Sequence, residues 1–234
     1  MTKPYNLEKV ENVLRELFFD RWQEQENNLY ENNLDPFSAV LSSAKNNMSI
    51  ENWFKLEETR QTGSTDQNNI GELHQKLISC FDGVEDLGTG GFLDTVSVSK
   101  KIIAEIKNKH NTTKGNHKRE IYDDISSKLS TSEYKGFTGY YVEVIPKRPN
   151  RYNKPFTPSD NRTKTKRPLN EKIRVIDGIS FYDLISGQEN TLKMLFNDII
   201  KIINKLMAEY NMPSENFSSE EFKELFDKVF FGSE

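Results

Sequence analysis

Three charged residues in the middle of the chain have the types and the spacing that phosphate chemistry requires. Asp94 lies in one short apolar segment, and Glu105 and Lys107 lie in the next. One or two carboxylates with water and phosphate oxygens are the ligands that Mg²⁺ prefers, and a bound divalent cation activates a phosphodiester and a water for hydrolysis. A lysine beside them stabilises the charge that develops on the phosphate. The three residues therefore predict metal-dependent phosphodiester hydrolysis.

Alternating apolar and polar residues predict how these side chains meet. Strand residues alternate between two faces, so Glu105 and Lys107 share a face, and Leu93 is expected on the face opposite to Asp94. With a two-residue turn at Ser99-Lys100, paired residue numbers sum to 199, and Asp94 lies opposite Glu105. Directly opposed Cβ atoms are about 5 Å apart, so the two carboxylates repel unless a cation neutralises them. The register thus predicts a β-hairpin that holds Mg²⁺ between Asp94 and Glu105.

The pattern of Asp94, Glu105 and Lys107 alone is common on solvated strands and helices. The segments before and after it in the sequence favour the interpretation as a site. A helix predicted over residues 70–81 carries Glu72 just before the hairpin, although the helix dipole alone also favours a glutamate in that first turn. Polar residues that suit contacts with phosphates and base edges follow the hairpin directly. They are Asn108, His110, Asn111 and Lys114.

Positive charge is concentrated in the middle of a chain whose net charge is −4. Residues 100–174 contain 19 Lys and Arg against 8 Asp and Glu, a balance of +11, and the remainder carries −15. Residues 147–174 are the most basic part, with ten basic residues against two acidic ones. A long, non-helical, basic segment is typical of nucleic-acid contact, and the alternative is a solvated charged surface. Its composition suggests Arg148, Arg151 and Lys154 as DNA contacts.

The remaining periodicity predicts a single α/β domain over residues 1–234. Helices are expected over residues 6–30, 37–45, 70–81, 116–129, 189–210 and 219–230, and a short helix after a strand within 173–185. Residues 137–145 are predicted to form a central strand, and residues 57–69 a loop. Residues 66–145 are the expected core, residues 147–174 the basic loop, and residues 189–231 the C-terminal helices.

Composition narrows the setting of the protein. The chain contains no run of 18 or more apolar residues, so no membrane-spanning helix is predicted. The first residues lack the apolar core of a signal peptide. The single cysteine, Cys80, excludes a disulfide within the chain and is expected to be a small buried side chain. These features predict a cytoplasmic protein without a membrane partner.

The order of these elements resembles a known nuclease core. A helix with Glu72, a strand with Asp94, a strand with Glu105-Ile106-Lys107 and a following helix resemble the PD-(D/E)xK superfamily. The segments IGELHQKLISCFDG, GGFLDTVSV and IIAEIKNKHNTTKG are more closely similar to type II restriction endonucleases that cut GGNCC or GGWCC palindromes. The resemblance covers about residues 50–145 well. Leu93 stands where the motif's name has proline, which many members also lack.

The resemblance implies a mixed central β-sheet flanked by helices, with extra helices at both ends of the chain. It further implies that Asp94 and Glu105 bind Mg²⁺, that Lys107 is the catalytic lysine, that Glu72 is an accessory acid, and that cleavage leaves 5′-phosphate and 3′-hydroxyl ends. A palindromic target implies a twofold homodimer on double-stranded DNA. Two alternatives remain: a non-specific or repair nuclease of the same fold, and a non-catalytic DNA-binding protein with Asp94 and Glu105 on its surface.

Overall fold

The computed structural model describes residues 2–20, 34–88, 93–113, 115–160, 165–214 and 217–232. A six-stranded sheet in the order β1-β2-β3-β4-β6-β5 forms its centre. The strands are β1 (Glu85–Asp86), β2 (Thr95–Ser97), β3 (Ile102–Lys109), β4 (Thr138–Ile145), β5 (Asn153–Pro155) and β6 (Ile173–Asp177). Pairs β3–β4 and β4–β6 are parallel, and the other pairs are antiparallel. The predicted α/β class, mixed sheet and central strand are confirmed.

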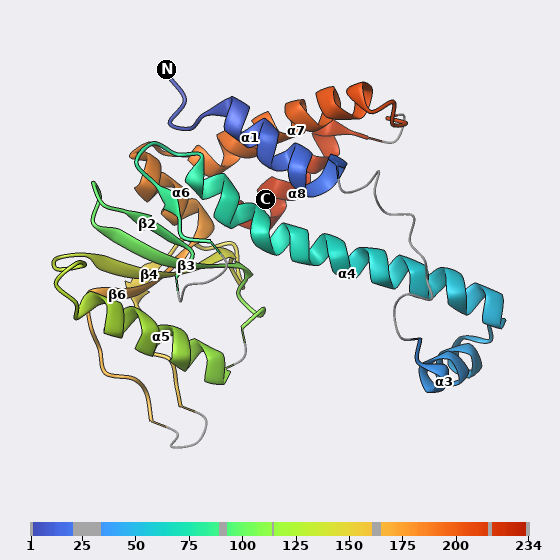
Figure 1. Cartoon of the computed structure of the whole chain (residues 1–234), viewed down its shortest axis with the longest axis horizontal. Helices are drawn as coiled ribbons and strands as arrows, with labels where there is room; N and C mark the ends of the chain where they lie inside the picture. The colour runs from blue at the N-terminus through green and yellow to red at the C-terminus, as the bar shows by residue number, and fades with distance from the viewer. Residues whose placement is uncertain are drawn as a thin grey trace.

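Helices cover both faces of this sheet (Figure 1). They are α1 (Leu7–Leu14), which continues as the π-helical turn η1 (Arg15–Asp20), α3 (Pro36–Asn46), α4 (Ile50–Ser79), α5 (Gly115–Leu129), α6 (Gly178–Ser186), α7 (Thr191–Glu209) and α8 (Ser219–Phe231). On one face, Ile102, Ala104 and Ile106 of β3 join an apolar core with α1, α4, α6 and α7. On the other face, Ile103 packs with α5. None of the described helices is long and apolar enough to cross a membrane.

The hairpin that presents Asp94 and Glu105 has the predicted register. Thr95 pairs with Ala104 and Val96 with Ile103, and the Lys101 amide donates to the Val98 carbonyl at 3.2 Å across the turn. The predicted position of Leu93 is wrong. By alternation, Val96 and Ile103 lie on the face of Asp94 and Glu105, and Leu93 packs in the same apolar cluster as these two residues. β2 begins only at Thr95, and strict alternation does not hold outside the pleated strand.

The predicted loop over residues 57–69 is also wrong, because these residues lie inside α4. Ser49 caps this helix and accepts from the Asn52 amide at 3.3 Å. No proline interrupts residues 50–79, so the backbone hydrogen bonds continue through a polar sequence without an apolar stripe. The helix predicted over residues 6–30 is found as α1 and η1 up to Asp20, and residues 21–33 lie outside the described part.

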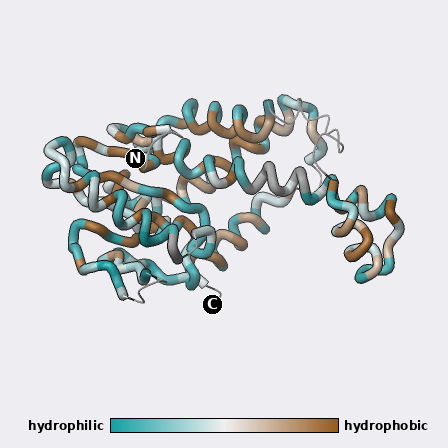
Figure 2. The backbone as a smooth tube through the Cα atoms, turned by 60° about the horizontal axis from the view of Figure 1, so that its bottom comes forward, coloured by the Kyte–Doolittle hydropathy of each residue, from teal (hydrophilic) through white to brown (hydrophobic). Residues whose placement is uncertain are grey.

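The N-terminal half of α4 and α3 together form an arm that projects from the body of the molecule (Figures 1 and 2). Trp53 of α4 and Ala39 of α3 are buried in this arm. The C-terminal half of α4 packs on the body through Leu77 and Ile78, and the buried Cys80 follows it as expected. A single helix, α4, therefore connects the arm to the sheet face formed by Ile102, Ala104 and Ile106 of β3.

Candidate active site

Asp94 is held between two strands by its own backbone. Its amide donates to the Ala104 carbonyl at 3.0 Å, and its carbonyl accepts from the Leu87 amide at 2.9 Å. Its Oδ2 accepts from the Ile106 amide of β3 at 2.6 Å. Its Oδ1 accepts from the Gln75 side chain of α4. The carboxylate orientation is therefore set by both the sheet and a helix.

Glu105 and Lys107 project from the same face of β3, as the alternation predicts. Glu105 is only 8% exposed, and Lys107 Nζ lies 2.6 Å from Glu105 Oε1. Their strand neighbour β4 places Tyr141 beside Glu105 and Glu143 beside Lys107. The structure thus brings the three central residues of the predicted site together at adjacent positions of one hairpin.

Negative charge is concentrated in this cluster on two carboxylates with little exposure to solvent. Burial and the nearby Glu105 charge raise the pKa of Asp94 to about 7, against the lowering effects of the Ile106 amide and of Lys107. A nearby positive charge favours the ionised form of a carboxyl group, so a bound cation would stabilise this buried pair. The donors are hard oxygens, which Mg²⁺ accepts in combination with water and phosphate oxygens. Within the described ranges, no group of three or more acidic, His or Cys side chains gathers to form a larger cage.

Glu72 and Lys107 line one cleft of about 460 Å³ between α4 and the end of β3. The cleft also contains Gln75 and Asn108. Glu72 Oε1 lies 3.4 Å from Lys76 Nζ, so its charge is partly balanced on its own helix. Residues 72 and 75 are three apart and share a helix face, which is the signal that could have identified Gln75 from the sequence.

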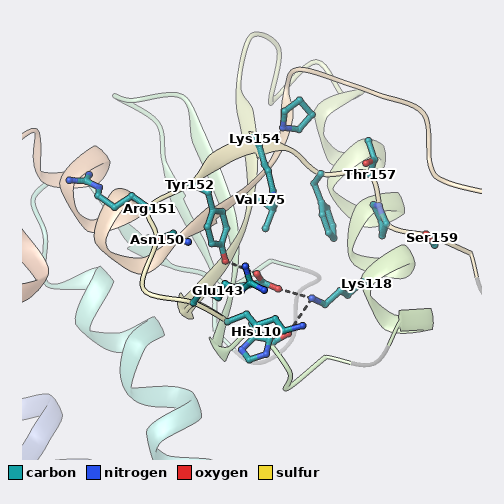
Figure 3. Close-up of a pocket in the computed structure, with 15 residues that line it drawn as sticks. His110, Lys118, Glu143, Asn150, Arg151, Tyr152, Lys154, Thr157, Ser159 and Val175 are labelled. Carbon is teal, nitrogen blue, oxygen red and sulfur yellow. Dashed lines mark hydrogen bonds and ion pairs between the residues drawn. The ribbon is translucent and has the colours of Figure 1, made fainter. Parts of the chain in front are cut away.

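Four of the seven predicted DNA contacts line a second hollow, a pocket of about 650 Å³ beside β4 (Figure 3). They are His110, Arg148, Arg151 and Lys154. Lys107 and Glu143 are paired residues, and Lys107 lines the cleft while Glu143 lines the pocket. The cleft and the basic pocket therefore meet across one pair of strands.

Two of the other three predicted DNA contacts, Asn108 and Asn111, are not among the residues that line this pocket. Asn108 has a buried Oδ1 without a hydrogen-bond partner among the described residues, Asn111 is exposed in the turn after β3, and Lys114 lies outside the described part. Arg151 is already bonded to α6, where its Nη2 donates to Asp183 Oδ2 at 2.8 Å and its Nε to Ser180 Oγ at 3.2 Å. Arg151 therefore anchors the basic segment to the body.

A buried network that sequence analysis missed forms one wall of the pocket. Glu143 is 9% exposed, and its two oxygens accept from Lys118 Nζ and from the Tyr152 hydroxyl, each at 2.6 Å (Figure 3). These residues come from β4, α5 and the basic segment. Their separations of 25 and 9 residues leave no periodic signal, because the contacts depend on the packing of α5 against the sheet.

Known proteins resemble most of the chain. A family model described as Eco47II restriction endonuclease matches residues 5–208. The type II restriction enzyme Eco47II of Escherichia coli is 37% identical over 201 residues, which cover 85% of this chain and 83% of that protein. The type II restriction enzyme Sau96I of Staphylococcus aureus is 29% identical over 194 residues, covering 82% and 71% respectively. No solved structure matches the chain.

Proposed function

The chain belongs to the Eco47II restriction endonuclease family and is a site-specific deoxyribonuclease, and we propose that it cuts double-stranded DNA at a GGNCC-like palindrome. We propose Mg²⁺ as its cofactor, and 5′-phosphate and 3′-hydroxyl ends as its products. The observation that carries this proposal is the cluster of Asp94, Glu105 and Lys107 next to a basic pocket.

Asp94 and Glu105 would hold the cation. When bound, Mg²⁺ supplies Lewis-acid activation of the phosphodiester and of the attacking water. The Ile106 amide and the Gln75 amide group both donate to Asp94, and they orient the carboxylate before any cation arrives. A carboxylate fixed by two donors, beside a second carboxylate paired with Lys107, supports a site that needs little rearrangement on binding.

Lys107 would stabilise the charge on the scissile phosphate and position the attacking water. Its ammonium group lies 2.6 Å from Glu105 Oε1, so the lysine lies next to the carboxylate that would bind the cation. Glu72 lines the cleft with Lys107 and would serve as an accessory acid there. Residues 66–145 would then form the catalytic core of a single domain.

The basic pocket would receive the DNA backbone beside the core. Arg148 and Lys154 line it, and no ion pair to either is found within the described ranges. Lys154 Nζ lies 5.4 Å above the Tyr152 ring. Unpaired cations at a pocket wall suit phosphate contacts, which position a protein on DNA and make its affinity dependent on salt.

We also propose that two copies act as a homodimer, because a palindrome presents the same site on both strands. The surface that supports this is an apolar stripe on α3 composed of Phe37, Val40 and Leu41, which are 79%, 68% and 71% exposed. At 100° per residue, the stripe lies on the side of α3 opposite to the buried Ala39. Its apolar surface is on the order of 400 Å² per copy, roughly half of what one partner buries in a standard interface.

Digestion of plasmid DNA with the purified protein tests the proposed activity. We expect discrete fragments with Mg²⁺ and none with EDTA, and sequencing of the ends should give one short palindrome with 5′-phosphate termini. Asp94→Asn should abolish cutting and leave DNA binding in a gel-shift assay. A smear would favour a non-specific or repair nuclease, and intact cutting by Lys107→Ala would contradict the role proposed for the lysine.

The same assay addresses the remaining alternative of a DNA-binding protein without catalysis. That alternative places Asp94 and Glu105 on the surface, whereas Glu105 is 8% exposed and burial shifts the pKa of Asp94. Family membership also favours an enzyme. We expect the enzyme to act in the cytoplasm, where its DNA substrate would be accessible.

A further inference from the structure

A second buried carboxylate lies beside the lysine of the candidate site. Glu143 of β4 pairs in register with Lys107 of β3, and both are on the face of the sheet that packs against α5. Neighbouring strands are about 4.8 Å apart, which places Glu143 within reach of the flexible lysine side chain. Lys107 therefore lies between two carboxylates, Glu105 on its own strand and Glu143 on the next.

The two carboxylates differ in their hydrogen-bond and ion-pair partners. Both oxygens of Glu143 are already bonded, Oε1 to Lys118 Nζ and Oε2 to the Tyr152 hydroxyl, at 2.6 Å each (Figure 3). Lys118 Nζ also donates to the His110 carbonyl at 3.2 Å and lies 5.2 Å from the centre of the Tyr141 ring. Lys118 is thus fixed by three groups around it.

Lys107 pairs with the first of these carboxylates. Its ammonium group lies 2.6 Å from Glu105, while Glu143 is neutralised by another cation. Two opposite charges attract strongly at short range in a partly buried site. A divalent cation bound by Glu105 would weaken its hold on Lys107, and an unneutralised Glu143 would then draw the lysine away from the phosphate.

We propose that Lys118 is a positioning residue that masks the charge of Glu143, so that Lys107 remains available to the scissile phosphate. Tyr152 assists as the second donor to Glu143, and through it the basic DNA-contact segment is joined to the strand next to the catalytic one. The inference rests on the role proposed for Lys107. It adds a residue of α5, on the wall of the basic pocket, whose charge acts on catalysis through Glu143.

The test compares Lys118→Met with the double variant Lys118→Met/Glu143→Gln. Single-turnover cleavage of an oligonucleotide duplex that contains the site is measured at saturating enzyme, and duplex affinity is measured without Mg²⁺. At saturating enzyme, where a change in affinity does not limit the rate, Lys118→Met should cut roughly 10- to 100-fold more slowly, as is typical when a supporting partner is lost. Adding Glu143→Gln should restore most of the rate, because no charge is left to attract Lys107.

Lys128→Met, on the same helix, is the matched control and should cut at the wild-type rate. Wild-type cleavage by Lys118→Met would overturn the inference, and so would a double variant as slow as the single one, because Lys118 would then act only as a structural support. If Lys118→Met does not fold, Lys118→Gln provides the same comparison with and without Glu143→Gln. Failure of the proposed function looks different: the wild-type protein would not cut, or Lys107→Ala would cut normally.

Discussion

The backbone amide of Ile106 donates to Asp94 Oδ2 at 2.6 Å. The main chain of β3 therefore orients the carboxylate of a residue that lies directly before β2. Residue 106 lies between Glu105 and Lys107. The same three-residue segment therefore supplies a candidate metal ligand, a candidate catalytic lysine, and the donor that orients the second metal ligand.

Asp94→Asn should stabilise the metal-free protein while it abolishes cutting. The substitution removes one of two carboxylates that repel each other. The asparagine amide oxygen can still accept from Ile106, and Gln75 can turn its own side-chain oxygen toward the new NH2 group. A one-unit pKa perturbation corresponds to about 1.4 kcal/mol, so we expect the free energy of unfolding to rise by about 1 kcal/mol or more. Thermal denaturation with and without Mg²⁺ checks this.

Mg²⁺ should raise the melting temperature of the wild-type protein and not that of Asp94→Asn, since a ligand stabilises only the state that binds it. Ca²⁺ provides a comparison that separates binding from turnover. A melting temperature that responds equally to Mg²⁺ in both proteins would place the cation elsewhere.

Gln75→Leu should weaken Mg²⁺ binding more than it weakens the fold. Gln75 donates to Asp94 Oδ1 from α4, and loss of such a supporting donor typically costs about 10- to 100-fold in metal affinity or activity. Titration of the cleavage rate with Mg²⁺ should give a higher half-saturating concentration, with a near-normal rate at saturation. Asn204→Leu is the control, because its amide group bonds to Ile200 and Ser219, within and between the C-terminal helices. An unchanged Mg²⁺ requirement would remove Gln75 from the site.

His74 should make the fold sensitive to acid. Its Nδ1 lies 3.0 Å from the Tyr182 hydroxyl, and burial lowers the pKa of His74 to about 4. The unfolded chain binds the proton near pH 6.5 and the folded chain only near pH 4, so the contribution of His74 to stability falls as the pH decreases through this interval, whereas the raised pKa of Asp94 contributes with the opposite sign. Full loss would approach about 3 kcal/mol.

Denaturant unfolding between pH 4 and 7 measures this slope. His74→Gln should lose less stability than the wild type as the pH decreases, and His117→Gln, at an exposed position on α5, should follow the wild type. Equal slopes for wild type and His74→Gln would show that other groups cause the acid sensitivity.

Val40→Asp or Leu41→Asp should dissociate the proposed dimer. A charge in the middle of an apolar interface is left unpaired and desolvated, which destabilises the dimer. Size-exclusion chromatography with light scattering should therefore give the mass of one chain for these variants. Ser38→Asp, about a quarter-turn away on the same helix, should leave the dimer intact. A dimer that survives both stripe substitutions would have its interface elsewhere, and a monomeric wild-type protein would contradict the homodimer itself.

How much of the site could be predicted depends on how local its contacts are. The register of Asp94 and Glu105 followed from the period-two alternation and the length of the turn, and the pairing of Thr95 with Ala104 confirms it. Gln75 and Lys118 are different, because they reach Asp94 and Glu143 only after α4 and α5 pack on the sheet. No spacing rule links residues of separate elements.

The fold shows the same division. Helices and strands with apolar periodicity were predicted within a few residues, as for β6 (Ile173–Asp177) and α6 (Gly178–Ser186). The polar half of α4 was missed because a helix that projects from the body has no continuous buried stripe to reveal its period. Its existence depends on the Ser49 cap and on uninterrupted backbone hydrogen bonds.

Mechanically, α4 is a lever. Its 30 residues give it a length of about 45 Å, with the α3 stripe at one end and Gln75 close to the other. A rigid rod of that length turns a tilt of about 5° at the sheet into a displacement of about 4 Å at the tip. The position of the arm and the orientation of Asp94 are therefore coupled through α4, because a movement of the arm also tilts the end of the helix that carries Gln75.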